Sequence, residues 1–196
     1  MRTPSPILFV AIFLLAACVS RGPSGAAPTQ HDLGLPPVAG SAQTKLALRR
    51  VEVIAAPVLS GLAMQYRYEG EQSTRRLSYA DNRWSATPQQ LLEAHLSRML
   101  IADGKGGHCK LQVRLDEFVQ IFAQNGSSVG YAAGSFRLLA DRADEVLAQQ
   151  AFVLKRPAPS ADAAGGALAL REVSASMAAE AARWLDTTDL RRCTAS

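Results

Sequence analysis

The second half of the sequence contains three consecutive segments that predict β-strands, and their short connections constrain the fold more than any other feature. The segments are 111–122, 129–139 and 146–155. From Leu111 onward apolar and polar residues alternate, as they do on a strand with one buried face. The first connection contains the turn sequence Asn125-Gly126, and the second is the polar run 141–145. Connections of this length favour antiparallel pairing of the three strands.

The first half predicts three more strands and one helix. The strands are expected at 45–55, 64–68 and 75–79. The helix begins at Thr87-Pro88, because threonine caps a helix end and proline suits the first helical position. Glycines 104, 106 and 107 end this helix. A final helix is predicted from an apolar stripe that consists of Leu170, Val173, Met177, Ala181 and Trp184.

The predicted order of elements is therefore βββαβββα. We expect an α+β fold, in which two helices pack on one mostly antiparallel sheet. Residues 45–196, about 150 in number, suit a single domain with a sizeable core.

The N-terminus predicts export and lipidation. Arg2 precedes an apolar run from Ile7 to Ala17, which is too short for the roughly 20 residues that span a membrane. The run closes on Leu-Ala-Ala-Cys, which matches the bacterial lipobox, so residues 1–17 are expected to be a signal peptide. Cys18 is then the lipidation site, acylated by chains such as palmitate. A plain signal peptide followed by an incidental cysteine is the alternative.

A lipidated cysteine would hold the protein on a membrane surface without spanning the membrane. The residues after Cys18 are Val19 and Ser20, without the aspartate that resembles an inner-membrane retention signal. We therefore expect an outer-membrane lipoprotein that faces the periplasm. Residues 18–44, rich in Gly, Ala, Pro, Ser and Thr, are predicted to form the lipidated cysteine and a flexible tether.

Two further cysteines, Cys109 and Cys193, are candidates for a disulfide, because the bacterial envelope outside the cytoplasm is oxidising. Such a bridge would fix the C-terminal tail and stabilise the domain by roughly 4–5 kcal/mol in the chain-entropy model. Two unrelated thiols are the alternative.

Charge and motifs argue against several classes of function. The formal net charge of +4 is too mild to indicate nucleic-acid binding, and the sequence has no concentrated block of basic residues of the kind that binds nucleic acid. The run 126–130 matches G-x-S-x-G around Ser128, but it follows a turn and leads into a strand, whereas a nucleophile elbow leads into a helix. His95 and His108-Cys109 lack the spacing of a zinc site. We predict neither catalytic residues nor a metal or other cofactor.

A group of aromatic residues interleaved with arginines is the most distinctive polar feature. It includes Tyr66, Arg67, Tyr79, Arg83 and Trp84. Tyrosine, tryptophan and arginine dominate binding hot spots, so these residues are candidates for a surface that docks a partner. The alternative is that the rings pack in the core under a helix while the arginines face water.

The same stretch resembles the ABC-type transport auxiliary lipoproteins, which include the lipoprotein of paraquat-inducible Pqi systems and others that accompany Mce-domain transporters. The resemblance rests on 56–61, 64–67, 77–79 and 82–84, together with His31-Asp32-Leu33-Gly34 and the Ala-x-x-Trp-Leu end of the last helix at 181–185. The family has tyrosine where this chain has His31. The resemblance extends from about His31 to Leu185, and its motifs are short.

This resemblance implies non-enzymatic work beside an Mce-domain periplasmic protein of an ABC-type transporter, which moves lipids or other apolar molecules across the envelope. ATP binding would belong to a partner, since the chain has no P-loop sequence. Assembly of several copies around the channel is a further expectation. The alternatives are a structural lipoprotein of another envelope assembly, such as a secretion or pilus machine, and a lipid-anchored hydrolase built on Ser128.

Overall fold

A computed structural model describes residues 27–35, 42, 44, 46–101, 107–140, 145–189 and 191–194. Cys18, the signal peptide and the first part of the predicted tether lie outside these residues. In the described part of the chain, no helix combines the length and the apolar character needed to cross a membrane.

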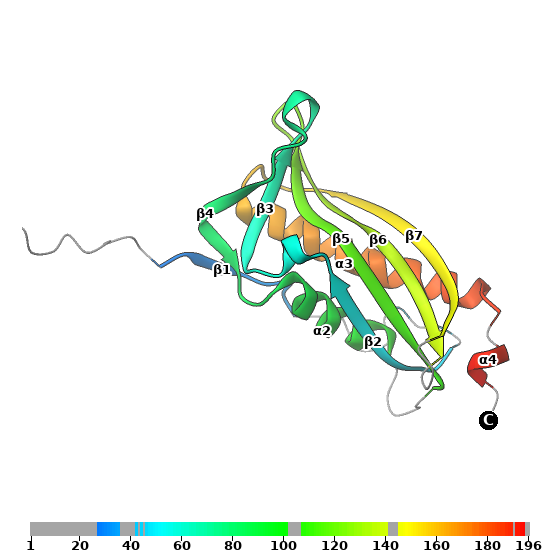
Figure 1. Cartoon of the computed structure of the whole chain (residues 1–196). Coiled ribbons are helices and arrows are strands. Elements are labelled where there is room, and N and C mark those ends of the chain that lie inside the picture. The colour runs from blue at the N-terminus through cyan, green and yellow to red at the C-terminus, as the bar shows by residue number, and fades with distance from the viewer. Residues whose placement is uncertain are drawn as a thin grey trace, which may run out of the picture.

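The elements confirm the predicted order and add one short element at each end (Figure 1). In chain order they are β1 (Thr29–His31), β2 (Leu48–Ala55), the 3-10 helix η2 (Pro57–Leu59), β3 (Ala63–Tyr68), the 3-10 helix η3 (Gly70–Gln72), β4 (Leu77–Trp84), α2 (Pro88–Leu100), β5 (Cys109–Phe122), β6 (Ser128–Ala140), β7 (Val146–Pro157), α3 (Ala163–Thr187) and α4 (Arg191–Thr194). The additions at the ends are β1 and α4, and the two short 3-10 helices η2 and η3 are additions within the chain.

The seven strands form one sheet that is built around β5. On one side β5 pairs antiparallel with β6, which pairs antiparallel with β7, as the hairpin connections predict. On its other side β5 pairs with β2 along its first half and with β3 at its last three residues, and both pairings are parallel. The parallel pairing of β2 with β5 is possible because α2 lies between them in the chain and provides the crossover.

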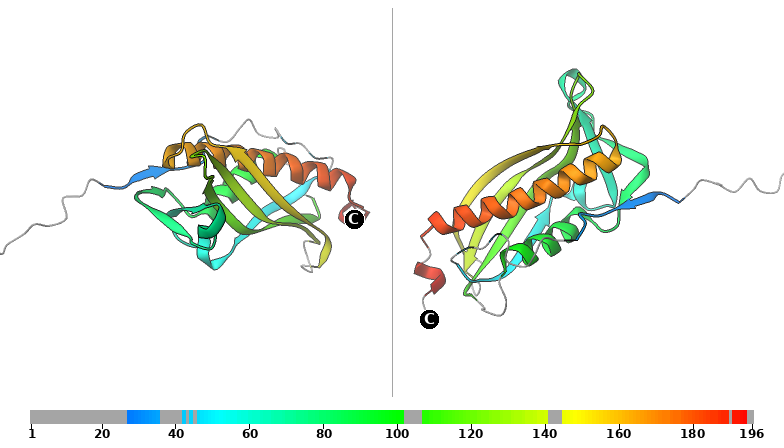
Figure 2. Two further views of the ribbon diagram at one scale, coloured as in Figure 1. Left: turned by 90° about the horizontal axis from the view of Figure 1, so that it is seen from above. Right: turned by 180° about the vertical axis from the view of Figure 1, so that it is seen from behind.

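Both long helices cover the same face of the sheet; we call the opposite face, which neither of them covers, the open face (Figure 2). α2 begins with a capping box between Thr87 and Gln90, as its sequence predicts. α3 begins at Asp162, whose side chain accepts a hydrogen bond from the backbone N–H of Gly165 at 2.7 Å. The predicted stripe of α3 is buried: Leu170, Val173, Met177 and Ala181 are 0–2% exposed, and Trp184 is 9% exposed.

Part of the predicted tether belongs to the domain. β1 pairs with the end of β4, and Leu33 after it is 1% exposed in the core. Gly34 follows with a φ of 72°, a conformation that glycine adopts without strain. The prediction of a flexible tether up to residue 44 is therefore wrong for these residues. Three paired residues and one buried leucine carry too little periodicity to show in a sequence rich in small residues.

A buried histidine fastens this N-terminal segment to both helices. His95 of α2 is 4% exposed, and its Nε2 lies 3.2 Å from the carbonyl oxygen of Gly34. Its Nδ1 lies 3.1 Å from Oγ of Ser174 on α3. His95 is thus a structural residue that joins three segments distant in the sequence.

The two cysteines of the domain form a disulfide, with their Sγ atoms 2.06 Å apart. Cys109 begins the central strand β5, and Cys193 lies in α4, so the bridge fastens the end of the chain to the middle of the sheet. Both are buried, at 0% and 3% exposure.

Candidate functional site

Four aromatic rings meet where β3, β4 and β5 approach their connecting turns. We call Tyr66, Tyr68, Tyr79 and Phe122 the aromatic cluster. The ring of Tyr66 is central, because its centroid lies 4.8 Å from that of Tyr79, 5.8 Å from that of Tyr68 and 5.6 Å from that of Phe122. Tyr68 and Phe122 are also in contact, with centroids 5.4 Å apart. The sheet register explains the meeting, since Tyr66 pairs with Gln120 and Tyr68 with Phe122.

A chain of hydrogen bonds holds the inner end of this cluster. The hydroxyl of Tyr79 donates to Oε1 of Gln120 at 2.8 Å, and Nε2 of Gln120 donates to Oγ of Ser128 at 2.8 Å. Gln120 is 1% exposed, and it lies so close to Gly166 of α3 that a side chain at that position would collide with it. Burial is the main cause that raises the pKa of Tyr79 far above its ordinary value, so the phenol stays a hydrogen-bond donor.

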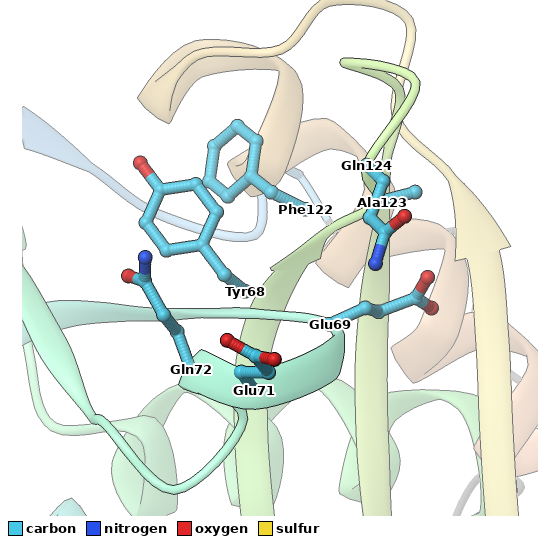
Figure 3. Close-up of a pocket in the computed structure, with 7 residues that line it drawn as sticks. All are labelled: Tyr68, Glu69, Glu71, Gln72, Phe122, Ala123 and Gln124. Carbon is cyan, nitrogen blue, oxygen red and sulfur yellow. The ribbon is translucent and has the colours of Figure 1, made fainter.

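The outer end of the cluster opens into a pocket of about 570 Å³ at the tip of the molecule, where η3 and the β5–β6 turn lie side by side (Figures 1 and 3). We call it the tip pocket. It is lined by Tyr68, Glu69, Glu71, Gln72, Phe122, Ala123 and Gln124. Tyr68 is 41% exposed, although its ring packs against those of Tyr66 and Phe122. Both glutamates are exposed.

Arg67, a predicted docking residue, forms part of an ion-pair network. Nη2 of Arg67 lies 3.0 Å from Oε1 of Glu117, and Nη2 of Arg76 lies 2.6 Å from Oε2 of the same carboxylate. Arg76 also donates to Oε1 of Gln65 at 2.7 Å. Successive residues of a strand point to opposite faces, so this network and the ring of Tyr66 lie on different faces of β3.

The other two predicted docking residues are neighbours on β4, where Trp84 is buried and Arg83 is half-buried. Trp84 is 1% exposed and packs against Phe118, with ring centroids 5.8 Å apart. Trp84 is therefore a core residue in this structure, and its prediction as part of a docking surface is wrong. The reason is that β4 continues to Trp84, beyond the predicted end at residue 79, and places this ring under the helices. Nε of Arg83 is buried without a hydrogen-bond partner among the described residues.

Of the five predicted residues, the structure thus brings Tyr66 and Tyr79 together in the aromatic cluster. Sequence reasoning missed Phe122, Glu69 and Glu71; it placed Tyr68 in the aromatic group but not among the predicted docking residues. Tyr68 has a visible signal, because it repeats Tyr66 two residues later on the same strand face. Phe122 has none, since it lies 54 residues beyond Tyr68 and only the β3–β5 register brings them together.

The remaining motifs have structural roles. Ser128 begins β6 after a turn, is 5% exposed and accepts the hydrogen bond from Gln120, so the G-x-S-x-G run is not a strand-to-helix elbow. Cys109 is held in the disulfide. Within the described ranges, no group of three or more His, Cys, Asp or Glu side chains is arranged to hold a metal ion.

The comparisons with known proteins bear on the fold. No family model matches the chain, and no curated protein matches it. A protein of Xanthomonas campestris that is assigned to the family DUF330 has a similar crystal structure, with a TM-score of 0.61 at 17% identity over 81% of this chain and 94% of that one. The crystal structure of an uncharacterized protein gives a TM-score of 0.62 at 15% identity over 82% and 99%. The chain therefore has the α+β fold of these proteins.

Proposed function

We propose that this chain is a lipid-anchored accessory protein of a bacterial envelope transport system, and that its domain acts by docking on a partner protein. The observation that carries the proposal is the aromatic cluster. Its inner ring, Tyr79, is fixed by a hydrogen bond to the buried Gln120, while Tyr68 stays exposed beside a pocket at the tip. Aromatic side chains held rigidly at a surface are typical of binding hot spots, because little entropy is lost when they are covered.

Two features of the sequence support the rest of the proposal. The lipobox at Cys18 provides the anchor, on the periplasmic side of the outer membrane. The resemblance over residues 31–185 to ABC-type transport auxiliary lipoproteins suggests the partner, an Mce-domain periplasmic protein of a transporter that moves lipids or other apolar molecules. In this proposal the chain is not an enzyme and needs no cofactor, and the transporter supplies ATP hydrolysis.

Gentle affinity isolation of the full chain from cross-linked cell envelopes, with partners identified by mass spectrometry, tests this function. We expect an Mce-domain protein among the specific partners. Recovery of secretion or pilus components alone would contradict the transport role and favour a structural lipoprotein of another assembly. Labelling with radioactive palmitate tests the anchor separately, since Cys18→Ser should abolish incorporation.

A further inference from the structure

We propose that the tip pocket binds an arginine or lysine side chain of the docking partner. This inference rests on the proposed function, because it identifies which surface docks and by which chemistry. The predicted docking surface combined aromatic residues and arginines of β3 and β4, whereas this proposal places the contact on acidic and aromatic residues of the tip.

The first argument is the charge of the pocket. Glu69 and Glu71 both line it, one before η3 and one within it, and their carboxylates have no ion-pair partner in the part of the chain that the structure describes. Two other carboxylates of the domain have such partners: Glu117 pairs with two arginines, and Glu52 lies 3.4 Å from Nζ of Lys110. Figure 3 shows the carboxylate of Glu71 directed into the space below Tyr68.

The second argument is the apolar wall. Tyr68 and Phe122 present neighbouring rings, tilted by 36° to one another, at the side of the same pocket. A cation over the face of an aromatic ring is attracted by the negative charge of that face, and a guanidinium group can stack on the ring while it hydrogen-bonds to a carboxylate. Rings and carboxylates together therefore favour a basic side chain over a neutral or acidic one.

The third argument is hydrogen-bonding capacity. The side-chain amides of Gln72 and Gln124 also line the pocket. The amide oxygen of Gln72 accepts one hydrogen bond from Nη1 of Arg75 at 3.3 Å and has a second lone pair for another donor, as each amide oxygen has two. A guanidinium group carries five N–H donors, so the pocket has acceptors for several of them at once. The ion-pair network of Arg67 and Arg76 with Glu117, by contrast, has more positive than negative charge and would repel a basic side chain.

Site-specific photo-cross-linking in living cells tests this proposal on the full chain. A benzophenone amino acid replaces Gln72 at the pocket in one strain and Val153, which is 63% exposed on β7 of the open face, in another. We expect the Gln72 position to cross-link to an Mce-domain protein at a peptide with an arginine or lysine. Glu69→Lys with Glu71→Lys should lower this yield about tenfold, which corresponds to about 1.4 kcal/mol.

The matched control is Asp116→Lys with Glu172→Lys, which makes the same charge change at exposed positions outside the pocket and should leave the yield unchanged. Replacing the partner's cross-linked basic residue by glutamate should restore the yield of the Glu69→Lys, Glu71→Lys variant. An undiminished cross-link from Gln72 in the Glu69→Lys, Glu71→Lys variant with the unaltered partner overturns the proposal, as does a cross-link to lipid. Cross-linking of the partner from Val153 alone overturns the tip contact but leaves the proposed function. No partner at either position overturns both.

Discussion

At the scale of single residues, the buried amide of Gln120 determines whether the aromatic cluster is rigid. Tyr79→Phe removes the hydroxyl that donates to this amide and leaves a buried acceptor without a donor. We expect a loss of about 1–2 kcal/mol in the free energy of unfolding, measured by urea denaturation. Tyr68→Phe keeps an exposed ring and should change the free energy of unfolding by less than about 0.5 kcal/mol. Equal losses for both variants would contradict the role of Gln120.

Asp162 makes the stability of the folded state depend on pH in the acid range. The backbone N–H of Gly165 and then the hydroxyl of Ser160 donate to its carboxylate and hold its pKa below the ordinary value of 3.8. The resulting stability is fully present above the pKa of the unfolded chain and is lost as the pH falls through the lower pKa of the folded state.

We therefore expect Asp162→Asn to lower the thermal midpoint at pH 7, and the difference from the wild type to shrink below about pH 4. Ser160→Ala removes one donor and should reduce the pH dependence in part. Thermal denaturation followed by circular dichroism at a series of pH values measures both effects. A difference that stays constant down to pH 2 would show that the carboxylate charge is not responsible.

At the scale of elements, His95 connects α2 to α3 and to the segment after β1. His95→Ala removes both contacts of the imidazole and leaves a cavity, so we expect a loss of about 2–3 kcal/mol. Hydrogen exchange should show a larger loss of protection at β1 than at β6. His108→Ala, at an exposed position, is the control and should leave the free energy of unfolding and the protection of β1 unchanged. Unchanged protection of β1 in the His95 variant would contradict the account.

The disulfide joins residues 84 positions apart and should stabilise the domain strongly. In the chain-entropy model, the closure of such a loop contributes roughly 4–5 kcal/mol. We expect Cys109→Ala with Cys193→Ala to lower the denaturation midpoint as much as a reducing agent lowers that of the wild type. The variant itself should not respond to the reducing agent. A wild type that is equally stable with and without the reducing agent would contradict this prediction.

The sequence predicts most elements, because alternation over many residues identifies β5, β6 and β7, and the capping box and apolar stripe identify α2 and α3. It does not predict β1, whose few residues show no period, or the parallel pairing of β2 and β3 with β5, which depends on contacts distant in the chain. For the candidate site, it identifies Tyr66 and Tyr79 but not Phe122. Trp84 was misassigned because the length of β4, which its local sequence leaves open, decides where that ring points.

At the scale of the whole molecule, β1, the tip pocket and α4 lie at different corners of the domain (Figure 1). If Cys18 carries the anchor, the extended chain from there to Thr29 reaches at most about 40 Å. The domain would then be held close to the membrane, and its tip would be free to meet a periplasmic partner.

The most direct test of the central claim is quantitative recovery of the Mce-domain partner from cross-linked envelopes, compared among three full-length chains at equal abundance. We expect the wild type and a control with Tyr131→Ala and Val153→Ala on the open face to recover the partner equally. Tyr68→Ala with Phe122→Ala should recover at least about tenfold less, as expected when a binding hot spot is removed. Equal recovery by all three chains, or no recovery of such a partner by the wild type, would contradict the account.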